Sequence, residues 1–386
     1  MTNLQQNPAP LSGMTVIELG HSVAAPFAGQ ILADLGARVI KIENPSGGDD
    51  ARHWGPPFWH GAASAFQSLN RNKISVTVNL KNDEERKKLK SLMLRADIIV
   101  QNMRPGLVER YGLGSEQLLE ANNKLIYCNL GAFGNVGPLK DKTGYDPLVQ
   151  AFSGIMSVTG EPERPPVRVG PSIIDQGAGM WCVIGILAAL MQRSSTGQGG
   201  TVDTSLYETA LSWMTIPIAS ALASGKDPGK SGSETPMLAP YRAFQAADRY
   251  VVIAAGNNNL FARLVTVLGH PEWAEDSRFI ENRDRIKNRV ELNSAIEAII
   301  RTMPASDWVE ALDAVGVPCS PVQSVSEVLA HSQTSELGML PHTPDGKMQL
   351  VATPLRFNGI RPEVRNSPPA LGHQSLEQLI GLTTGN

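Results

Sequence analysis

Asp175 is the residue whose surroundings most clearly point to chemistry. It lies in a Gly- and Pro-containing stretch, residues 169–179, just before an apolar run from Trp181 to Met191 that predicts a buried helix. Its oxygens could simply cap the free N–H groups of the first helical turn. Alternatively, Gly177 and Gly179 leave room for a ligand carbonyl, and the helix dipole would keep the carboxylate ionised and nucleophilic.

Size and charge describe an ordinary globular chain. Its 386 residues suggest two or three folding units, and a net charge of −3 gives no reason to expect a nucleic-acid partner. The three cysteines are far apart and predict reduced core residues. The first residues lack a signal-peptide pattern, and the apolar run from Met180 to Met191 is too short to span a bilayer. We therefore expect a cytoplasmic protein with no membrane contact.

Several common site signatures are missing from the sequence. Neither G-x-G-x-x-G nor G-x-x-x-x-G-K-[ST] follows the first predicted strand, and G-x-S-x-G does not occur. The seven histidines show no metal-ligand spacing. A standard nucleotide site, a serine nucleophile elbow and a metal site are therefore not expected.

The first half of the chain alternates between apolar strands and helices. This alternation predicts an open parallel sheet with helices on both faces. The predicted strands are 14–19, 38–43, 74–78, 97–100 and 124–129, and the predicted helices are 26–35, 82–94, 176–192 and 205–222.

A change of composition marks a second unit. Residues 224–236 are rich in Gly, Ser, Lys and Pro and predict a linker. Beyond it we expect a smaller α+β unit with a hairpin, followed by an irregular, Pro-rich tail. The predicted hairpin strands are 241–245 and 249–254, and the predicted helices are 260–268, 289–302 and 305–315. The domain boundaries follow as 1–225 for the large domain, 226–325 for the small domain and 326–386 for a segment that returns to the large domain.

Several separated segments, in this order, are similar to one known family. The first group is 11–19, Ala25-Pro26 and 32–43 with Gly48-Asp49 and Arg52; the second is 70–75, 101–106 with Arg110, 144–146, 316–321 and 368–372. Together they resemble the family III CoA-transferases, the group of formyl-CoA transferase and carnitine CoA-transferase. The likeness covers nearly the whole chain. It implies a Rossmann-like large domain built from both chain ends, an inserted α+β domain, and an interlocked homodimer of ring-like subunits.

The resemblance also implies an activity. The family's nucleophilic aspartate precedes a Gly-containing helix that leads to A-A-L-x-x-R and G-x-G, which match Asp175, residues 188–193 and residues 197–199. The implied reaction moves CoA from an acyl-CoA to an acid through an aspartyl anhydride and an aspartyl-CoA thioester. Gly177 and Gly179 are candidate N–H donors to the oxyanion. CoA or acyl-CoA enters as a substrate, and no permanently bound cofactor or metal is implied.

CoA contacts carry over to positions that match the family's motifs, mostly at strand ends. Their cationic members suit the 3′-phospho-ADP group, although each Arg or Lys taken alone could be a solvated surface charge. Formyl-CoA transferases carry Gln at the position of Val23, which argues against oxalate and formate specificity. The positions are His21, Ser22, Val23, Ala24, Asn44, Arg52, Leu69, Asn72, Lys73, Asn102, Met103, Arg104, Arg110 and Tyr145.

Two alternatives stay open. A 2-methylacyl-CoA racemase of the same fold uses a His in a Gly-His-Asp motif, but this chain has Tyr145 there, a poor proton shuttle. A non-catalytic CoA-binding protein would be expected to lack the carboxylate of Asp175. As substrates we expect a small carboxylic or dicarboxylic acid, with succinyl-CoA as a plausible donor. This expectation rests on four arginines near the predicted site segments, Arg52, Arg71, Arg104 and Arg168.

Overall fold

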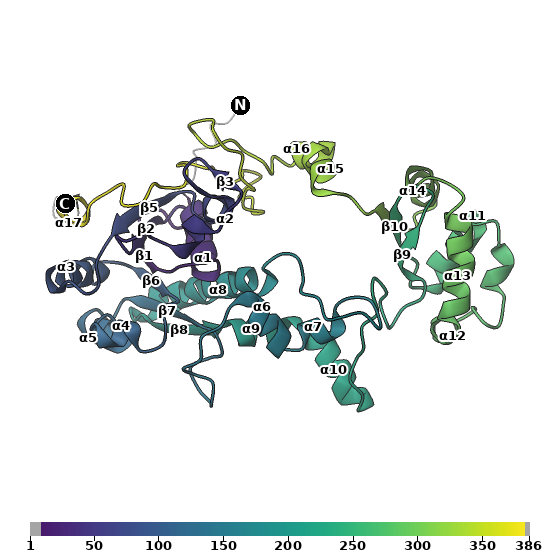
Figure 1. Cartoon of the computed structure of the whole chain (residues 1–386), viewed down its shortest axis with the longest axis horizontal. Coiled ribbons are helices and arrows are strands. Elements are labelled where there is room, and N and C mark those ends of the chain that lie inside the picture. The colour runs from purple at the N-terminus through teal and green to yellow at the C-terminus, as the bar shows by residue number, and fades with distance from the viewer. Residues whose placement is uncertain (1–8, 383–386) are drawn as a thin grey trace. The chain divides into compact units, whose positions relative to one another are not determined.

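The chain folds into two compact units (Figure 1). The computed structural model describes residues 9–382. The first unit comprises the chain up to Ile155, Arg168–Ala223 and the chain from Gln333 onward, and the second comprises Met156–Val167 and Ser224–Ser332. The sequence-based boundaries differ from these, because they gave all of residues 1–225 to one domain.

Segment 156–167 accounts for the largest difference. It has no apolar periodicity and several prolines and charges, so nothing in its sequence separates it from the large domain to which residues 1–225 were assigned. The structure places it in the second unit, where the Gly232 N–H donates to the Gly160 carbonyl at 3.0 Å and Lys230 donates to the Arg164 carbonyl. The chain therefore enters the second unit twice.

The first unit is built on a six-stranded parallel sheet with the order β5-β2-β1-β6-β7-β8. Its order reverses between β1 and β6, and in open α/β sheets such a switch point is where ligands bind. The predicted parallel sheet is confirmed, although its last strand was not anticipated. The strands are β1 (Thr15–Leu19), β2 (Arg38–Glu43), β5 (Lys73–Thr77), β6 (Ile98–Gln101), β7 (Ile126–Gly131) and β8 (Gly200–Ser205).

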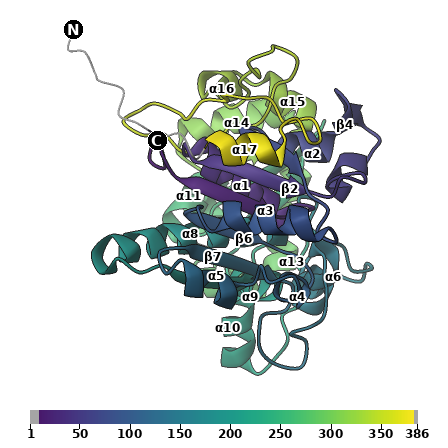
Figure 2. The same ribbon diagram turned by 90° about the vertical axis from the view of Figure 1, so that its left-hand side faces the viewer.

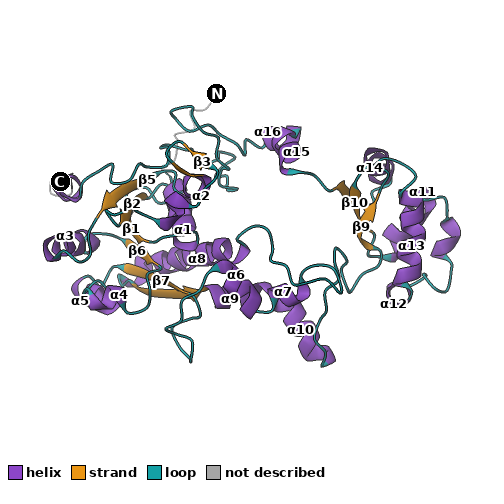
Figure 3. Ribbon diagram, in the orientation of Figure 1, coloured by secondary structure: helices purple, strands orange, loops and turns teal. Residues whose placement is uncertain are grey.

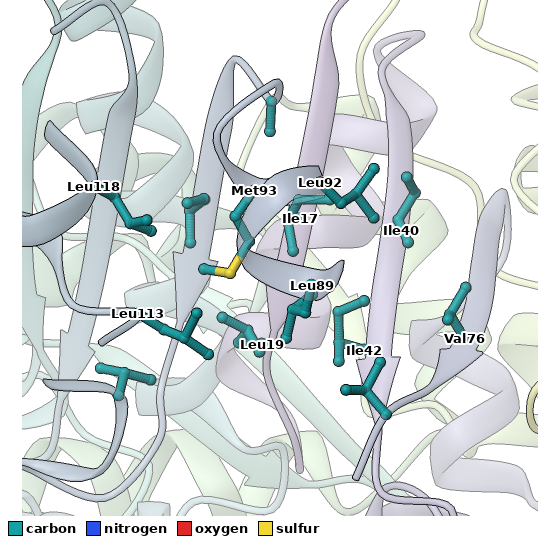
Figure 4. Close-up of a cluster of buried hydrophobic side chains, with 14 of the residues drawn as sticks. Ile17, Leu19, Ile40, Ile42, Val76, Leu89, Leu92, Met93, Leu113 and Leu118 are labelled. Carbon is teal, nitrogen blue, oxygen red and sulfur yellow. The ribbon is translucent and has the colours of Figure 1, made fainter. Parts of the chain in front are cut away.

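Helices cover both faces of this sheet (Figures 1 and 3). One face carries α1 (Ala24–Asp34) and α8 (Ile173–Thr196). The other carries α3 (Asp83–Met93), α5 (Ser115–Ala121) and α17 (Leu376–Leu382), and α17 lies beside α3 (Figure 2). Buried apolar side chains of β1, β2 and α3 form the core between the sheet and this second layer (Figure 4).

The remaining helices and the small sheet of the first unit connect these layers. The sequence predicts one helix over 205–222, but the structure has two, because Pro217 favours the first turn of a new helix. The elements are η1 (Asp50–His53), β3 (Phe58–Trp59), β4 (Ala62–Ala63), α2 (Ser64–Leu69), α4 (Leu107–Arg110), α6 (Asp146–Phe152), α9 (Leu206–Trp213) and α10 (Thr215–Ser224). At the junctions of the two units lie α7 (Ile155–Val158) and α16 (Ser332–Glu336).

The second unit packs helices on a three-stranded antiparallel sheet, and its predicted hairpin and main helices are found. Asn257 caps the helix that follows the hairpin, accepting the Leu260 N–H at 2.9 Å. The elements are β9 (Tyr241–Gln245), β10 (Tyr250–Ala254), α11 (Asn258–Val267), η2 (Pro271–Ala274), α12 (Asn282–Lys287), α13 (Arg289–Ile300), α14 (Ala305–Ala314), β11 (Cys319–Pro321) and α15 (Val325–Ala330).

Helix α8 is longer than the apolar run that predicted it. It has 24 residues, and an 18-residue window within it has a mean hydropathy of 1.7, so by length and composition alone it could cross a membrane. The expectation that the apolar run is too short for this was therefore wrong. In the structure α8 packs on α1 and the sheet of the first unit, as the core helix of a globular unit does.

Candidate active site

A cavity of about 200 Å³ lies where the sheet order reverses. The loop after β1 and the loop after β6 form part of its wall, as expected at the carboxyl ends of parallel strands. Asp175, at the start of α8, lines the same cavity, together with the segment 142–145 before α6. The lining residues are His21, Ser22, Ala24, Asn102, Met103, Arg104, Pro105, Leu130, Gly131, Ala132, Lys142, Thr143, Gly144, Tyr145, Asp175 and Leu206.

The loop after β1 is held by the side chain of Asn102. The Asn102 amide accepts the backbone N–H of His21 and donates to the backbone carbonyl of the same residue, both at 3.0 Å. Asn102 therefore fixes the loop of a neighbouring strand while it lines the cavity. Burial lowers the pKa of His21, which favours a neutral imidazole next to the cavity.

Ser22, the next residue, adopts a left-handed conformation with φ of 70°. A non-glycine residue pays a conformational cost there, so neighbouring contacts must hold it. The Ser22 N–H donates to the Asp49 carboxylate at 2.9 Å. Asp49 in turn lies 2.8 Å from the buried Nζ of Lys41, and Lys41 also donates to the Gly20 carbonyl at 2.7 Å. A buried ion pair thus fixes the loop that lines the cavity.

A row of amide side chains fixes the loop after β6. The Met103 N–H donates to Oε1 of Gln101 at 2.8 Å, and Gln101 donates to Asn129 at 2.8 Å. Asn129 donates to Asp203 at 2.9 Å, so the row crosses the ends of β6, β7 and β8. It places the Met103 backbone at the cavity without using the side chain of Met103.

Asp175 itself lies in the first turn of α8. Ser172, at the cap position, makes no side-chain cap hydrogen bond. Instead, Oδ2 of Asp146 accepts the backbone N–H groups of Ile174 and Asp175 at 2.8 and 3.1 Å. Because Asp146 provides the cap, the alternative in which the Asp175 side chain caps α8 is not what the structure has. The carboxyl group of Asp175 is left facing the cavity.

Gly177 and Gly179 do not leave room for a ligand. A Cβ on Gly177 would lie 2.7 Å from the ring of Trp213, and a Cβ on Gly179 would lie 2.7 Å from the Ala24 carbonyl oxygen. Both glycines therefore serve the close packing of α8 on α9 and α1. Both lie past the first turn of the α-helix, where N–H groups bond to carbonyls four residues earlier, so they are unsuited as oxyanion donors.

The charge state of Asp175 also differs from the sequence-based expectation. Burial, followed by the nearby negative charge of Asp146, raises the pKa of Asp175 to about 7. The positive end of the helix dipole, which Asp146 already neutralises in part, does not prevent this. In the chain without ligand, the carboxylate is therefore ionised fully only above neutral pH.

Cations and an aromatic ring lie at the mouth of the cavity. Arg104 and Lys142 line it with exposed side chains, and Tyr145 lines it with about half of its surface exposed. Guanidinium and ammonium groups in such a position are suited to bind phosphate or carboxylate oxygens. Of the arginines expected to act on substrate, Arg104 is the one that lines this cavity.

The structure places three other predicted CoA ligands elsewhere, deep in the first unit. Arg52 pairs with Glu43 at 2.7 Å, and Lys73 pairs with Glu18 at 2.8 Å. Asn72 bonds the backbone of the C-terminal segment through the N–H groups of residues 365 and 366. All three are buried with their polar groups engaged, so in this structure they are neither solvated charges nor free to meet a phosphate.

The remaining predicted positions also lie outside the cavity lining. Val23 is the cap residue of α1, and Leu69 ends α2 in the core. Asn44 is exposed and accepts the Ser46 N–H at 2.9 Å, and Arg110 is exposed over the ring of Tyr111.

The two further arginines behind the substrate expectation are also engaged within the chain. Arg71 pairs with Asp34 at 2.6 Å and is buried. Arg168 donates to the carbonyls of Val169 and Gly170 beside it. Neither lines the cavity. The cations that could bind an acidic substrate there are Arg104 and Lys142.

Sequence reasoning did not identify three residues that build the site. Lys142 lines the cavity, Asp49 holds Ser22, and Asp146 caps α8. Asp49 and Asp146 both lie in segments that resemble the family, so their positions were visible. Their roles were not, because both act through backbone N–H groups of residues distant in sequence.

Comparisons with known proteins agree with this geometry. The sequence profile of CoA-transferase family III matches residues 11–375. The acetyl-CoA:oxalate CoA-transferase of Acetobacter aceti is 38% identical over 95% of this chain and 94% of its own length. The succinate–glutarate CoA-transferase of Agrobacterium fabrum is 35% identical over 100% of this chain and 98% of its own.

A solved structure extends the likeness to three dimensions. The crystal structure of a CAIB/BAIF family protein from Brucella suis superposes with a TM-score of 0.86 at 36% identity, covering 98% of this chain and 99% of that one. Sequence and fold thus agree over almost the full length. The chain belongs to CoA-transferase family III and is a CoA-transferase.

Proposed function

We propose that this enzyme moves CoA from an acyl-CoA donor to a small dicarboxylic acid, with Asp175 as the covalent nucleophile. One observation carries the proposal: Asp175 lies at the cavity of the sheet's switch point without serving as the cap of its own helix. Its carboxyl group is therefore available to a substrate. Arg104 and Lys142 at the same cavity provide the positive charge that an anionic acyl-CoA requires.

The reaction consists of four substitutions at carbonyl carbons. The Asp175 carboxylate attacks the donor thioester, and the C–S bond breaks to give a mixed anhydride and CoA thiolate. The thiolate attacks the aspartyl carbonyl and releases the donor acid, leaving an aspartyl-CoA thioester. The acceptor carboxylate displaces CoA to form a second anhydride. CoA then attacks the acceptor's carbonyl, which yields the new acyl-CoA and restores Asp175 as a carboxylate.

No proton is gained or lost over this cycle. Each nucleophile and each leaving group is a carboxylate or a thiolate, so the site must hold anions rather than shuttle protons. Cations at the cavity mouth and backbone N–H groups suit that task, and an acid-base residue is not needed. This agrees with a neutral His21 and with a tyrosine, Tyr145, where the related racemases carry a histidine.

The proposed acceptor is a dicarboxylic acid, and succinyl-CoA is the proposed donor. The named acids of the two relatives, oxalate and glutarate, are both dicarboxylic acids. A carboxylate that is not transferred would pair with Arg104 or Lys142 while the other attacks. Because the two relatives differ in their acid, an assay panel must identify the one used here.

We also propose that the enzyme is a homodimer and that it is cytoplasmic. Helix α10 is apolar, yet none of its residues is buried within the chain, and apolar side chains of α8 and α9 are also exposed. An apolar helix is normally covered by protein. A second copy of the chain, interlocked with the first as the family resemblance implies, would cover these helices.

Trapping the covalent intermediate tests the nucleophile. The enzyme is incubated with succinyl-CoA, and hydroxylamine or borohydride is added during turnover before peptide mapping. We expect the label on the peptide that contains Asp175, and we expect Asp175→Asn to lose exchange while it still binds CoA. A label at another residue, or full activity of Asp175→Asn, would overturn the assignment.

A second assay separates the rival reaction of the same fold. A 2-methylacyl-CoA is incubated with enzyme in deuterated water, without any acceptor acid. We expect no deuterium at C2, because the transferase chemistry breaks no C–H bond. Deuterium incorporation would identify a racemase, and neither exchange nor incorporation with any donor would indicate a CoA-binding protein without turnover.

A further inference from the structure

We infer that Asp146 is a positioning residue for the nucleophile: held by Gln150, its carboxyl group fixes the first turn of α8 and thereby the side chain of Asp175. This inference rests on the function proposed above, in which Asp175 is acylated. Asp146 touches the backbone of the nucleophile rather than the reacting atoms, so it acts through Asp175.

Asp146 is buried and hydrogen-bonded to the first turn of α8. Asp146 is the first residue of α6 and only 2% exposed. Its Oδ2 accepts the N–H groups of Ile174 and of Asp175 itself, at 2.8 and 3.1 Å. Because one oxygen binds the nucleophile's own backbone, any movement of Asp146 is passed directly to Asp175.

Gln150, one turn further along α6, completes the support. It is fully buried, and its amide nitrogen donates to Oδ1 of Asp146 at 2.5 Å. Its amide oxygen accepts the backbone N–H of Val169 at 2.9 Å. The two side chains of α6 therefore hold both ends of the segment that leads into α8, before Pro171 and after it. A segment held at two points has little freedom to displace Asp175 when substrate binds.

The same carboxyl group sets the charge around the nucleophile. All three donors to Asp146 are neutral, two backbone N–H groups and one amide, so its negative charge is not cancelled by an ion pair with them. This charge contributes, after burial, to the raised pKa of Asp175. The other ionisable side chains that line the cavity around Asp175 are His21, Arg104, Lys142 and Tyr145. None of these four is a carboxylate, so they cannot replace the effect of Asp146.

Two substitutions separate position from charge. Asp146→Asn keeps the shape and an acceptor oxygen but removes the charge, whereas Asp146→Ala removes both. The single-turnover rate of Asp175 acylation by succinyl-CoA is measured from pH 5 to pH 9 for each. We expect both variants to reach half-maximal rate about one pH unit below wild type, because a like charge has been removed. At pH 9 we expect Asp146→Ala to be slower by roughly 10- to 100-fold and Asp146→Asn to recover most of that loss.

A helix cap away from the cavity provides the matched control. Asn82 caps α3 with a similar pair of hydrogen bonds: its side-chain oxygen accepts the N–H groups of Glu84 and Glu85 at 2.9 and 3.3 Å. Asn82→Ala should lower Tm without changing the acylation rate or its pH midpoint. If Asp146→Ala and Asp146→Asn behave like Asn82→Ala, Asp146 is an ordinary helix cap and the inference is wrong.

The same data distinguish this inference from the proposed function. If Asp175→Asn retains exchange, the nucleophile has been misassigned, whatever Asp146 does. If Asp175→Asn is inactive while both Asp146 variants keep the wild-type rate and midpoint, only the positioning role fails. Because Asp146→Asn is nearly isosteric, it keeps the test decisive even if Asp146→Ala does not fold.

Discussion

At the scale of a single residue, the proposed nucleophile Asp175 lies in an environment that disfavours its ionised form. Burial and Asp146 raise the pKa of Asp175 to about 7, and a neutral carboxyl group is a poor nucleophile. We therefore expect kcat/KM for acyl-CoA to increase as pH rises through about 7 and then to level off. Initial rates across pH 5 to 9 provide the measurement. An acidic limb near pH 4 would show that Asp175 titrates as it would in water.

The same pKa predicts how stability changes with pH. Between pH 3.8, the ordinary pKa of this carboxyl group, and about pH 7, the folded state holds a proton that the unfolded state has lost. This contribution to stability is present below pH 4 and is lost as pH rises through 7. Asn does not titrate, so Asp175→Asn does not lose this stability. The variant should therefore become more stable relative to wild type as pH rises. We expect a gain on the order of 1–3 kcal/mol at pH 8, reduced by solvent at this partly exposed site.

Urea unfolding of both proteins at pH 4 and pH 8 measures this difference. Asp146→Asn is a useful companion, because it should give part of the same gain by removing the like charge. An equal stability difference at the two pH values would contradict the prediction.

The buried ion pairs beneath the β1 loop predict a stability effect at another residue. Lys41 is fully buried between Glu18 and Asp49, at 2.9 and 2.8 Å. Lys41→Met would leave the Asp49 carboxylate buried without its cation, which typically costs about 3–5 kcal/mol. It would also release the Gly20 carbonyl, so we expect KM for acyl-CoA to rise more than KM for the acid.

Chemical unfolding and two-substrate kinetics test this prediction. The control is Lys88→Met, which breaks an exposed ion pair with Glu377 and should change stability by less than about 1 kcal/mol. If Lys41→Met were as mild as the control, the buried network would not support the loop.

Sequence alone singled out Asp175 as the candidate nucleophile, but it did not show that Asp146 holds the backbone of Asp175. A motif gives the type and order of residues, and Asp175 belongs to the most specific one. Arg52 and Asn72 show the limit of such reasoning, because their side chains could equally bind a phosphate or the chain's own backbone. Only the fold reveals that the backbone near Pro369 and Arg365 occupies them.

Close packing of two helices governs the site at the scale of secondary structure. Gly179 lets α8 approach the start of α1, so that a Cβ would lie 2.7 Å from the Ala24 carbonyl oxygen. Gly179→Ala should therefore destabilise the protein by about 1–3 kcal/mol despite the higher helix propensity of Ala. Because α1 begins at the cavity, we also expect weaker acyl-CoA binding.

Thermal unfolding and CoA titration measure these effects. Gly381→Ala in α17 is the matched control, because within the described residues, its own helix backbone aside, no atom lies within 4 Å of its Cβ position. That variant should be neutral or more stable by up to about 1 kcal/mol. A neutral Gly179→Ala would mean that the two helices separate easily.

Strands were predictable from the sequence where they are buried on both faces and therefore form largely apolar runs. The central strands β1, β2 and β6 are buried on both faces and rich in Ile and Val, so they could be recognised from the sequence even though β1 contains Glu18 and β2 contains Lys41. The edge strand β8 alternates between exposed and partly buried residues and contains Asp203 and three hydroxyl side chains, so no apolar run marks it as a strand. Local pattern does not show that β7 pairs with it.

Exposed apolar helices lead to a prediction at the scale of the whole molecule. In α10, Ile216 and Leu222 are 60% and 82% exposed. If a second copy of the chain covers this helix, the wild type should sediment as a dimer. The double variant Ile216→Asp, Leu222→Asp should sediment as a monomer or lose solubility, because buried charges without partners are costly.

The control for this experiment is Val290→Asp, a single exposed apolar side chain on α13 of the second unit. We expect it to leave the assembly unchanged. A monomeric wild type at micromolar concentration would contradict the proposed homodimer and would leave α10 for another partner.

The first unit is completed by a part of the chain that is synthesised last. Arg71 donates to the Val351 carbonyl at 2.8 Å, and Asn72 accepts the Arg365 N–H at 2.7 Å. A ribosome adds roughly 5–20 residues per second, so these two contacts cannot form until tens of seconds after Arg71 and Asn72 emerge. The inserted unit can fold in that interval, whereas the first unit still lacks the segment that begins at Gln333 and includes α17. A nascent chain that stops before this last stretch would thus be recognised by cellular quality control rather than persist as a shortened enzyme.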